Sequence, residues 1–284
     1  MLLNGKNIYT LLKTAEEFLK FKGLHECRAD AEVLLSFVLQ TKRSKLPLIR
    51  DQKPTDKQIL QYQNYVIRRS KHEPAAYITG YAGFMGLEFK VNKNVLIPRP
   101  ETELLTESVL KIAKEKNKKS VLDLCTGSGC IAVSLANLGN FEEITASDIS
   151  TDALAAAKKN AEINNIYKIK FIESDMFNKI PYHKFDIIIS NPPYVSESEY
   201  TALEPELKFE PKNALTAKDD GLFFYKKIAE NADKYLNENG YICIELNSNK
   251  TEDIYKIFLN RKYTHIEIIN DYSGLPRILK SQKP

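Results

Sequence analysis

Residues 121–132 read Val121-Leu122-Asp123-Leu124-Cys125-Thr126-Gly127-Ser128-Gly129-Cys130-Ile131-Ala132, an order that predicts a buried strand, a glycine turn and the start of a helix. Gly127 and Gly129 let the backbone pass close to a ligand, and the small residues beside them keep that approach open. The pattern is not a complete dinucleotide-binding fingerprint, because Ala132 stands where the third glycine would be. Taken alone, the stretch also fits a tight strand–helix turn without a ligand.

The second informative stretch is Asn191-Pro192-Pro193-Tyr194, which directly follows the apolar run 185–190. Proline lacks the N–H that a strand interior needs, so the doublet marks the end of a buried strand and the start of a rigid loop. Ligands of open α/β sheets bind at this carboxyl edge. There the Asn191 side-chain carbonyl and the Pro192 backbone carbonyl can each accept a hydrogen of a planar –NH2 group, while Tyr194 packs beside its plane. The alternative is a strand-terminating turn with a surface tyrosine.

Two further strand ends carry residues that suit a nucleoside. The predicted strand 143–148 ends in Asp148, where a carboxylate can bind both hydroxyls of a ribose. The predicted strand 168–175 leads into Asp175-Met176-Phe177, which suits the edge and the face of an adenine. The cofactor site expected from these strand ends comprises Cys125, Thr126, Gly127, Ser128, Gly129, Asp148, Met176 and Asn191.

Together these features resemble the S-adenosylmethionine-dependent methyltransferases that modify planar amide or exocyclic amino nitrogens. A narrower resemblance comes from Val95-Leu96-Ile97-Pro98-Arg99-Pro100-Glu101-Thr102-Glu103, which is similar to the signature of the peptide chain release factor glutamine methyltransferases, the HemK/PrmC family. Matches to this family run from about residue 28 to residue 280. Cys125 departs from the family pattern, because it stands in place of the first loop glycine.

The resemblance implies both a fold and an activity. The implied fold is α/β: a Rossmann-like class I methyltransferase domain with a mostly parallel sheet and an antiparallel strand, preceded by a small all-helical domain and a β-hairpin linker. The implied activity is methyl transfer from S-adenosyl-L-methionine to the side-chain nitrogen (N5) of the glutamine in the Gly-Gly-Gln motif of peptide chain release factors. Asn191 and Pro192 are the expected catalytic residues, and the expected substrate-binding residues are Asn191, Pro192, Pro193 and Tyr194.

The chain is expected to divide into three segments. Residues 1–82 carry short apolar stripes at helical spacing and no strand pattern, as in a small helical bundle. Residues 83–97 belong to an alternating stretch that begins at Tyr77, and they form the hairpin linker. Residues 98–284 alternate strands and helices, which predicts a parallel sheet, and they end in closely spaced strands. Since the helical segment has no cofactor duty, we expect it to dock the protein substrate.

Residues 98–103 fit two roles. Pro98 and Pro100 fix an extended approach to a helix, and Glu101 and Glu103 near its start favour the helix dipole. The resemblance places the same residues beside the cofactor pocket. The sequence leaves both roles open.

Composition narrows the class of protein. The net charge of +4 is mild, so the sequence does not require a nucleic-acid partner. The four cysteines have no metal-like spacing and the four histidines are scattered, which indicates reduced thiols, no metal and a cytoplasmic location. Residues 1–6 lack the apolar core of a signal peptide, and no apolar run approaches the ~20 residues of a membrane span. We expect a monomer that binds neither DNA nor membrane.

Two other classes of function remain open. The first is a methyltransferase for an exocyclic amine of nucleic acid, N6 of adenine or the amino group of guanine, because the same loop chemistry serves a flipped base. Against it, the chain has no strong basic stripe and no large insertion for reading DNA. The second is a binding module that has lost its chemistry, against which the intact Asn191 and Asp148 argue.

Overall fold

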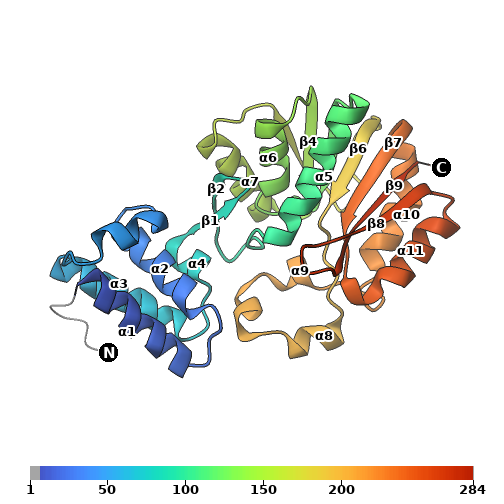
Figure 1. The fold of residues 1–284 in the computed structure, drawn as a ribbon. Coiled ribbons are helices and arrows are strands. Elements are labelled where there is room, and N and C mark those ends of the chain that lie inside the picture. Colours follow the sequence, from blue (N-terminus) through green and yellow to red (C-terminus); the bar gives the residue numbers. More distant parts are fainter. Residues whose placement is uncertain (1–6, 284) are drawn as a thin grey trace. The chain divides into compact units, whose positions relative to one another are not determined.

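The structure, a computed structural model, describes residues 7–283 of the chain. Residues 1–6, for which the signal-peptide expectation was stated, and residue 284 lie outside the described part. The chain forms two compact units (Figure 1). The helical unit comprises the residues up to Tyr81 and the segment Glu204–Phe209, and the sheet unit comprises Ala82–Leu203 and the residues from Glu210 onward.

The helical unit is a bundle with its own buried core. Its elements are α1 (Ile8–Phe21), α2 (Cys27–Val38), the 3-10 helix η1 (Arg43–Ile49), α3 (Asp56–Arg69), α4 (Ala75–Thr79) and the 3-10 helix η2 (Pro205–Phe209). Asn7 caps α1 by accepting a hydrogen bond from the N–H of Thr10, and Thr55 forms a capping box with Gln58 at the start of α3. Apolar residues of α1, α2 and α3 face this core at helical spacing, whereas Leu60 of α3, which the same spacing placed on the apolar stripe, is exposed.

A buried arginine joins three parts of the helical unit. Arg69 is only 6% exposed, and its Nε donates to Asp30 Oδ2 at 2.7 Å. Its Nη1 donates to Glu206 Oε1 at 3.1 Å, and His72 Nδ1 lies 3.0 Å from the same oxygen. The segment Glu204–Phe209 is therefore held to the helical unit by ionic hydrogen bonds, although in the sequence it lies between two stretches of the sheet unit.

The sheet unit contains a seven-stranded sheet in the order β5-β4-β3-β6-β7-β9-β8. Its strands are β3 (Ser120–Leu124), β4 (Glu143–Asp148), β5 (Ile169–Glu173), β6 (Phe185–Ser190), β7 (Leu236–Glu245), β8 (Thr264–Asn270) and β9 (Pro276–Gln282). The strands β3, β4, β5, β6 and β7 run parallel, whereas β9 pairs antiparallel with both β7 and β8. This confirms the predicted α/β fold with a mostly parallel sheet.

Helices cover both faces of the sheet (Figure 1). The longer ones are α5 (Pro100–Lys116), α6 (Cys130–Leu138), α7 (Thr151–Ile163), α10 (Phe223–Tyr235) and α11 (Thr251–Asn260), and the short ones are α8 (Glu197–Ala202), α9 (Lys212–Leu215) and η3 (Ser248–Lys250). Successive strand residues point to opposite faces, so Val121 packs with α5, α6 and α7, while Leu122 packs with α10 and α11. Both faces are buried, which explains the nearly continuous apolar runs of the central strands.

The hairpin differs in extent from the stretch Tyr77–Ile97 that alternation indicated. Its strands are β1 (Tyr81–Phe84) and β2 (Leu87–Lys90), and the short helix α4 precedes them. Phe84 and Phe89 are fully buried in the core of the sheet unit, where their rings meet edge to face at 6.1 Å. Nearly all of the hairpin thus packs as part of the sheet unit.

The order of the strands reverses between β3 and β6. From β3 the chain adds β4 and β5 on one side, and then crosses to place β6 and β7 on the other. Leu124 at the end of β3 pairs with Ser190 at the end of β6, so the glycine turn and the Asn-Pro-Pro-Tyr loop leave the sheet as neighbours. A crevice at such a switch point is the usual ligand site of this architecture.

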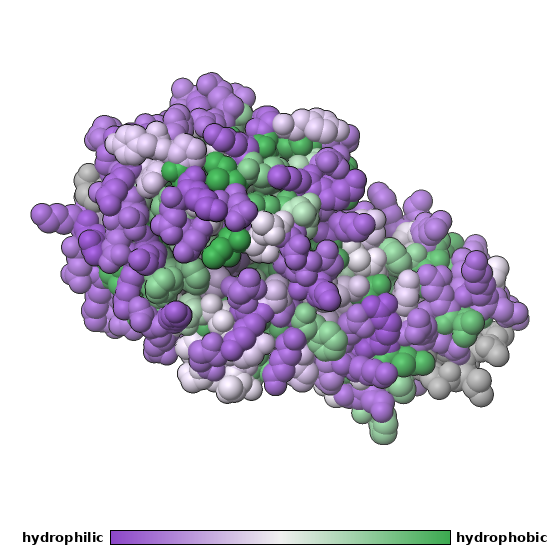
Figure 2. Space-filling model, turned by 180° about the vertical axis from the view of Figure 1, so that it is seen from behind, coloured by the Kyte–Doolittle hydropathy of each residue, from purple (hydrophilic) through white to green (hydrophobic). Residues whose placement is uncertain are grey.

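The surface that Figure 2 shows is mostly hydrophilic, with hydrophobic residues in small groups. No helix within residues 7–283 combines the length and the apolar content that crossing a membrane requires.

Candidate active site

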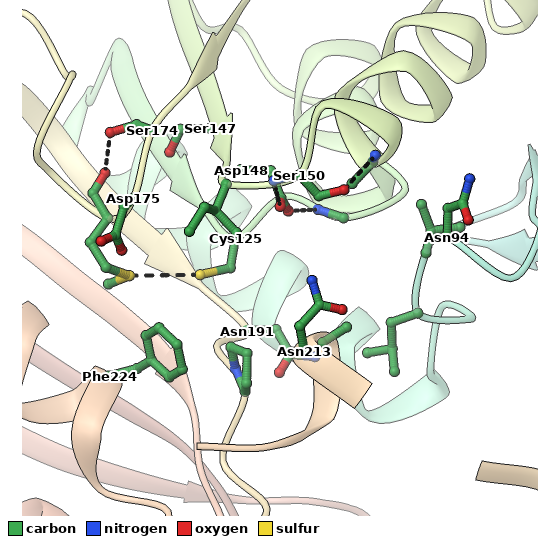
Figure 3. A pocket seen from close by; sticks show the side chains of 18 of the residues that line it. Asn94, Cys125, Ser147, Asp148, Ser150, Ser174, Asp175, Asn191, Asn213 and Phe224 are labelled. Atoms are coloured by element: carbon green, nitrogen blue, oxygen red, sulfur yellow. Dashed lines mark hydrogen bonds between the residues drawn. The ribbon is translucent and has the colours of Figure 1, made fainter. Parts of the chain in front are cut away.

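One cavity lies at the carboxyl ends of β3, β4, β5 and β6 (Figure 3). All of its walls belong to the sheet unit. It is lined by Asn94, Val95, Leu96, Cys125, Gly127, Ser147, Asp148, Ile149, Ser150, Ala153, Ser174, Asp175, Met176, Asn191, Pro193, Asn213, Ala214, Phe223 and Phe224. The four strand ends that the sequence singled out therefore meet around one space.

The two glycines of the turn have different structural roles. Gly127 has φ +56°, lines the cavity, and has open space where a Cβ would stand. Gly129 has φ +79°, but a Cβ there would lie 2.9 Å from the Cβ of Ala157, so glycine is needed for the close approach of α6 to α7. Only the first of them borders the space that a ligand could fill.

The other turn residues divide in the same way. Cys125 lines the cavity and has φ +61°, a backbone conformation that favours glycine, and glycine is the residue that the family resemblance led us to expect there. Thr126 and Ser128 are buried, and the Thr126 hydroxyl donates to Asp123 Oδ2 at 2.6 Å. Neither Thr126 nor Ser128 is among the cavity-lining residues, so their side chains shape the turn from behind.

Asp148 lies at the end of β4, where the ribose acid was predicted. Its Oδ2 accepts the N–H of Gly127 at 2.9 Å and its Oδ1 accepts the N–H of Ser150 at 2.9 Å, which fixes the carboxylate at the rim of the glycine turn. Burial raises the pKa of Asp148, although these backbone hydrogen bonds act against the shift. Each oxygen keeps a lone pair for a ligand hydroxyl.

The end of β5 forms the apolar part of the cavity. Met176 lines it with φ +50°, and its sulfur lies 3.8 Å from the sulfur of Cys125. Asp175 and Phe224 line the cavity as well, and Figure 3 shows both on the same side of it. Phe177 is buried and stacks on Tyr235 at 5.0 Å, so it supports the cavity and does not line it. A flat apolar group with a polar edge fits this end.

The loop after β6 brings Asn191 and Pro193 to the cavity. Asn191 Nδ2 donates to Thr102 Oγ1 at 3.0 Å. Pro192 is buried and is not a lining residue. Tyr194 is not a lining residue either: its hydroxyl donates to Glu245 Oε1 at 3.2 Å, and burial raises its pKa. The ring of Tyr194 therefore packs behind the loop against the core of the sheet unit, neither beside the cavity nor as a surface tyrosine.

Residues 98–103 hold the sheet unit together. Arg99 pairs with the buried Glu210, whose other oxygen accepts the N–H of Ile97 at 2.9 Å. Glu103 accepts the N–H of Met85 at 2.6 Å. None of the residues 98–103 lines the cavity, but Thr102 contacts the lining residue Asn191 through a hydrogen bond.

Several lining residues carried no usable signal in the sequence. Asn213 and Phe224 lie far along the chain from the four strand ends, in the short helix α9 and in the first turn of α10. Asn94 belongs to the stretch before α5. These residues reach the cavity only through tertiary folding.

Within residues 7–283, no three His, Cys, Asp or Glu side chains are grouped so that they could hold a metal ion. The reversal of strand order, with the glycine turn and an Asn-Pro-Pro-Tyr loop meeting at one cavity, defines a methyltransferase of the Rossmann-like class I type. Comparison with family descriptions agrees, because residues 100–220 match the methyltransferase small domain and residues 10–80 match the PrmC N-terminal domain.

Sequence relatives specify the family. A release factor glutamine methyltransferase of Leptospira interrogans is 39% identical over 278 residues, which cover 96% of this chain and 97% of that protein. One from Fusobacterium nucleatum is 38% identical over 271 residues, which cover 94% of this chain and 76% of that protein. The chain belongs to the release factor glutamine methyltransferase family.

Solved structures confirm the fold. A methyltransferase from Pyrococcus furiosus, 19% identical, matches with a TM-score of 0.52 over 70% of this chain and 89% of that one. A 16S rRNA methyltransferase of T. thermophilus, also 19% identical, matches with a TM-score of 0.53 over 72% of this chain and 50% of that one. At such identities the likeness concerns the fold alone.

Proposed function

We propose that this protein methylates the side-chain amide nitrogen of the glutamine in the Gly-Gly-Gln motif of peptide chain release factors, with S-adenosyl-L-methionine as the methyl donor. The observation that carries the proposal is the position of Asn191, whose amide borders the cavity and is anchored by Thr102. Membership of the family supports the substrate, since the relatives bear the name of this activity.

The cavity fits the donor. Asp148 offers a carboxylate for ribose hydroxyls, Met176 and Phe224 offer apolar faces for an adenine, and Gly127 leaves open space beside them. We propose that Cys125 and Asn191 complete this site, and that Thr126, Ser128 and Gly129 take part through the backbone of the turn. When bound, the donor supplies a methyl group already activated by a sulfonium.

The task of the protein is alignment. An amide nitrogen is a poor nucleophile, because its lone pair is delocalised into the carbonyl. We propose that Asn191 Oδ1 and the Pro192 carbonyl accept the two amide hydrogens of the substrate, which fixes the nitrogen and stabilises the positive charge that develops on it. Pro193 keeps the loop extended, which lowers the cost of ordering it, and Tyr194 supports it from behind. The proton leaves after methyl transfer and goes to water.

The helical unit completes the proposal. One glutamine is too small for the cavity to distinguish it from other glutamines, so specificity requires a second surface. We propose that the helical unit docks the body of the release factor and that two weak contacts strengthen each other through effective concentration. We place the enzyme in the cytoplasm as a monomer, and its four free cysteines agree with a reducing compartment.

Substitution of Asn191 tests the chemistry. We expect Asn191→Ala to lose methyl transfer by about 10²–10³-fold, because it deletes a transition-state acceptor, and to retain most cofactor affinity. Asn191→Asp retains an acceptor and is expected to keep partial activity. The measurement is mass spectrometry of a co-expressed release factor, with calorimetry of S-adenosylmethionine binding beside it. As a control, Asp148→Ala should weaken that binding.

Two outcomes contradict the proposal. Near-normal turnover by Asn191→Ala would make that side chain merely structural. Methyl transfer to nucleic acid and not to release factor, measured with labelled cofactor, would select the exocyclic-amine alternative.

A further inference from the structure

Three side chains from distant parts of the chain form a hydrogen-bonded relay that ends at Asn191. Glu245 lies at the end of β7, Thr102 in the first turn of α5, and Asn191 after β6. Thr102 Oγ1 donates to Glu245 Oε2 at 2.6 Å, and Asn191 Nδ2 donates to Thr102 Oγ1 at 3.0 Å. Glu245 and Thr102 are 1% and 3% exposed, so water does not compete for these bonds.

The chemistry of the three groups fixes the direction of the relay. A carboxylate only accepts hydrogen bonds, so the single proton of the Thr102 hydroxyl is directed to Glu245. The Thr102 oxygen can then only accept, and Asn191 must present its Nδ2 to it. The carbonyl oxygen of the same amide is thereby turned away from Thr102. No hydrogen bond within residues 7–283 engages Asn191 Oδ1, which is left to accept from a ligand.

Glu245 is itself fixed in place. Its second oxygen accepts the Tyr194 hydroxyl at 3.2 Å, and its backbone carbonyl accepts the Tyr225 hydroxyl at 3.1 Å. Burial raises the pKa of Glu245, and hydrogen bonding from Thr102 and the charge of Arg277 act in the opposite direction. A buried carboxylate is unfavourable unless its partners are well placed. Here the two side-chain partners are Thr102, which bonds to Asn191, and Tyr194, which lies in the same loop as Asn191.

We propose that Glu245 is a positioning residue: through Thr102 it sets the polarity of the Asn191 amide, so that the carbonyl oxygen and not the –NH2 group meets the substrate nitrogen. The inference rests on the proposed function. A flipped amide would place –NH2 against –NH2, and the transition state would lose an acceptor for its developing charge. The same arrangement gives Tyr194 a role, because its hydroxyl donates a hydrogen bond to the second carboxylate oxygen of Glu245.

Glu245→Gln reverses the relay with little change of shape. A glutamine whose carbonyl oxygen still accepts the Tyr194 hydroxyl places its –NH2 group against Thr102 and donates to the Thr102 oxygen. The Thr102 proton then turns to Asn191, whose amide must flip to present Oδ1 to it. We expect kcat to fall by about 10²–10³-fold, while KM for release factor and Kd for S-adenosylmethionine stay within about threefold of wild type.

Substitutions at Thr102 separate positioning from packing. Thr102→Val removes the hydroxyl and should lower kcat to a similar degree, whereas Thr102→Ser keeps it and should restore kcat to within about fivefold of wild type. Thr106→Val is the matched control: it removes another buried hydroxyl from the same helix, one that bonds only to the Thr102 backbone carbonyl at 3.1 Å. We expect Thr106→Val to leave kcat within about twofold.

The combined variant Thr102→Val/Glu245→Gln gives the sharpest outcome. If Glu245 acts through Thr102, kcat of the double variant should equal that of Thr102→Val alone. If the loss in the double variant is instead the product of the losses in the two single variants, the relay is overturned. Unchanged kcat in Thr102→Val, with normal cofactor binding, would also overturn it.

A spectroscopic readout separates failure of the relay from failure of the proposed substrate. The side-chain amide signals of Asn191, identified by their loss in Asn191→Ala, should be protected from solvent exchange in wild type and in Thr106→Val. They should lose that protection in Thr102→Val and move in Glu245→Gln. If they do so while wild-type enzyme methylates no release factor, the proposed function fails and the relay stands; unchanged signals in both variants refute the relay.

Discussion

At the scale of single residues, Asp123 connects burial with pH dependence. It lies inside β3, is fully buried, and has one oxygen, Oδ1, without a hydrogen-bond partner. Burial raises its pKa to about 7, although the Thr126 hydroxyl bound to Oδ2 acts against this. The folded state therefore binds a proton more tightly than the unfolded state, in which the pKa is about 3.9.

The sign of the effect follows from that difference. Between these two pKa values the native state holds a proton that the unfolded state has released, so stability is fully present below pH ~4 and falls as the pH rises to about 7. Asp123→Asn removes the titration. The quantity to measure is the difference between the unfolding free energies of wild type and Asp123→Asn. We expect this difference to decrease by on the order of 4 kcal/mol from pH 4 to pH 7 and then to stay constant.

Asp186→Asn provides the matched control for urea unfolding at several pH values. Partial burial favours a higher pKa at Asp186, but hydrogen bonds from the N–H of Lys119 and from Asn237 outweigh it and hold the pKa below its usual value. The difference for this variant should be flat above pH 5. An Asp123→Asn difference that is equally flat from pH 4 to pH 7 would contradict the assigned pKa.

At the scale of elements, the glycine turn separates helix packing from ligand binding. Gly129→Ala places a Cβ 2.9 Å from that of Ala157 and 3.1 Å from its Cα, where α7 backbone must shift, and φ is +79°. We expect a loss of roughly 2–4 kcal/mol in the free energy of unfolding. Gly127→Ala has open space at φ +56°, so it should lose only about 1 kcal/mol and weaken S-adenosylmethionine binding.

Gly86→Ala isolates the cost of the backbone conformation. Gly86 has φ +76°, open space for a Cβ and no place in the cavity wall, so about 1 kcal/mol of lost stability with unchanged cofactor affinity is expected. Thermal or urea unfolding with calorimetry measures both quantities. Equal stability losses at residues 127 and 129 would mean that α6 and α7 adjust easily.

Local signals account for what the sequence could predict at this scale. The strand ends at Asp148 and Asn191 were predictable because apolar runs stop at polar or proline residues, and parallel strands end at one edge. Helix α4 and the 3-10 helix η1 were missed because such short elements show little periodicity. The contact of Thr102 with Glu245 joins positions 143 residues apart, and no local pattern marks either of them as partners of Asn191.

At the scale of the whole molecule, the two units have separate hydrophobic cores. One buried cluster lies wholly in the helical unit and two lie in the sheet unit. The expected linker 83–97 supplies Phe84 and Phe89 to the sheet unit, whereas Glu204–Phe209 groups with the helical unit. Periodicity could indicate that an N-terminal helical unit precedes the sheet unit. It could not indicate that Glu204–Phe209 belongs to the helical unit, because a six-residue segment that is attached through Glu206 shows no distinctive pattern in the sequence.

Removal of the helical unit tests its docking role. A chain beginning at Gly80 keeps the whole hairpin, including Phe84, and therefore the complete core of the sheet unit. We expect it to fold and to bind S-adenosylmethionine, but to lose most activity on intact release factor, because the substrate is no longer held by a second surface. Its activity on a short Gly-Gly-Gln peptide should match that of the full chain, since a short peptide cannot use that surface.

The comparison of the two substrates gives this prediction its control. Calorimetry of cofactor binding and thermal unfolding first establish that the shortened chain is folded, which matters because the segment Glu204–Phe209 loses its partner Arg69. The preference of the full chain for intact factor over peptide should then nearly vanish in the shortened chain. If the shortened chain is folded and methylates intact factor at the full-length rate, the sheet unit alone recognises the factor and the docking role is wrong.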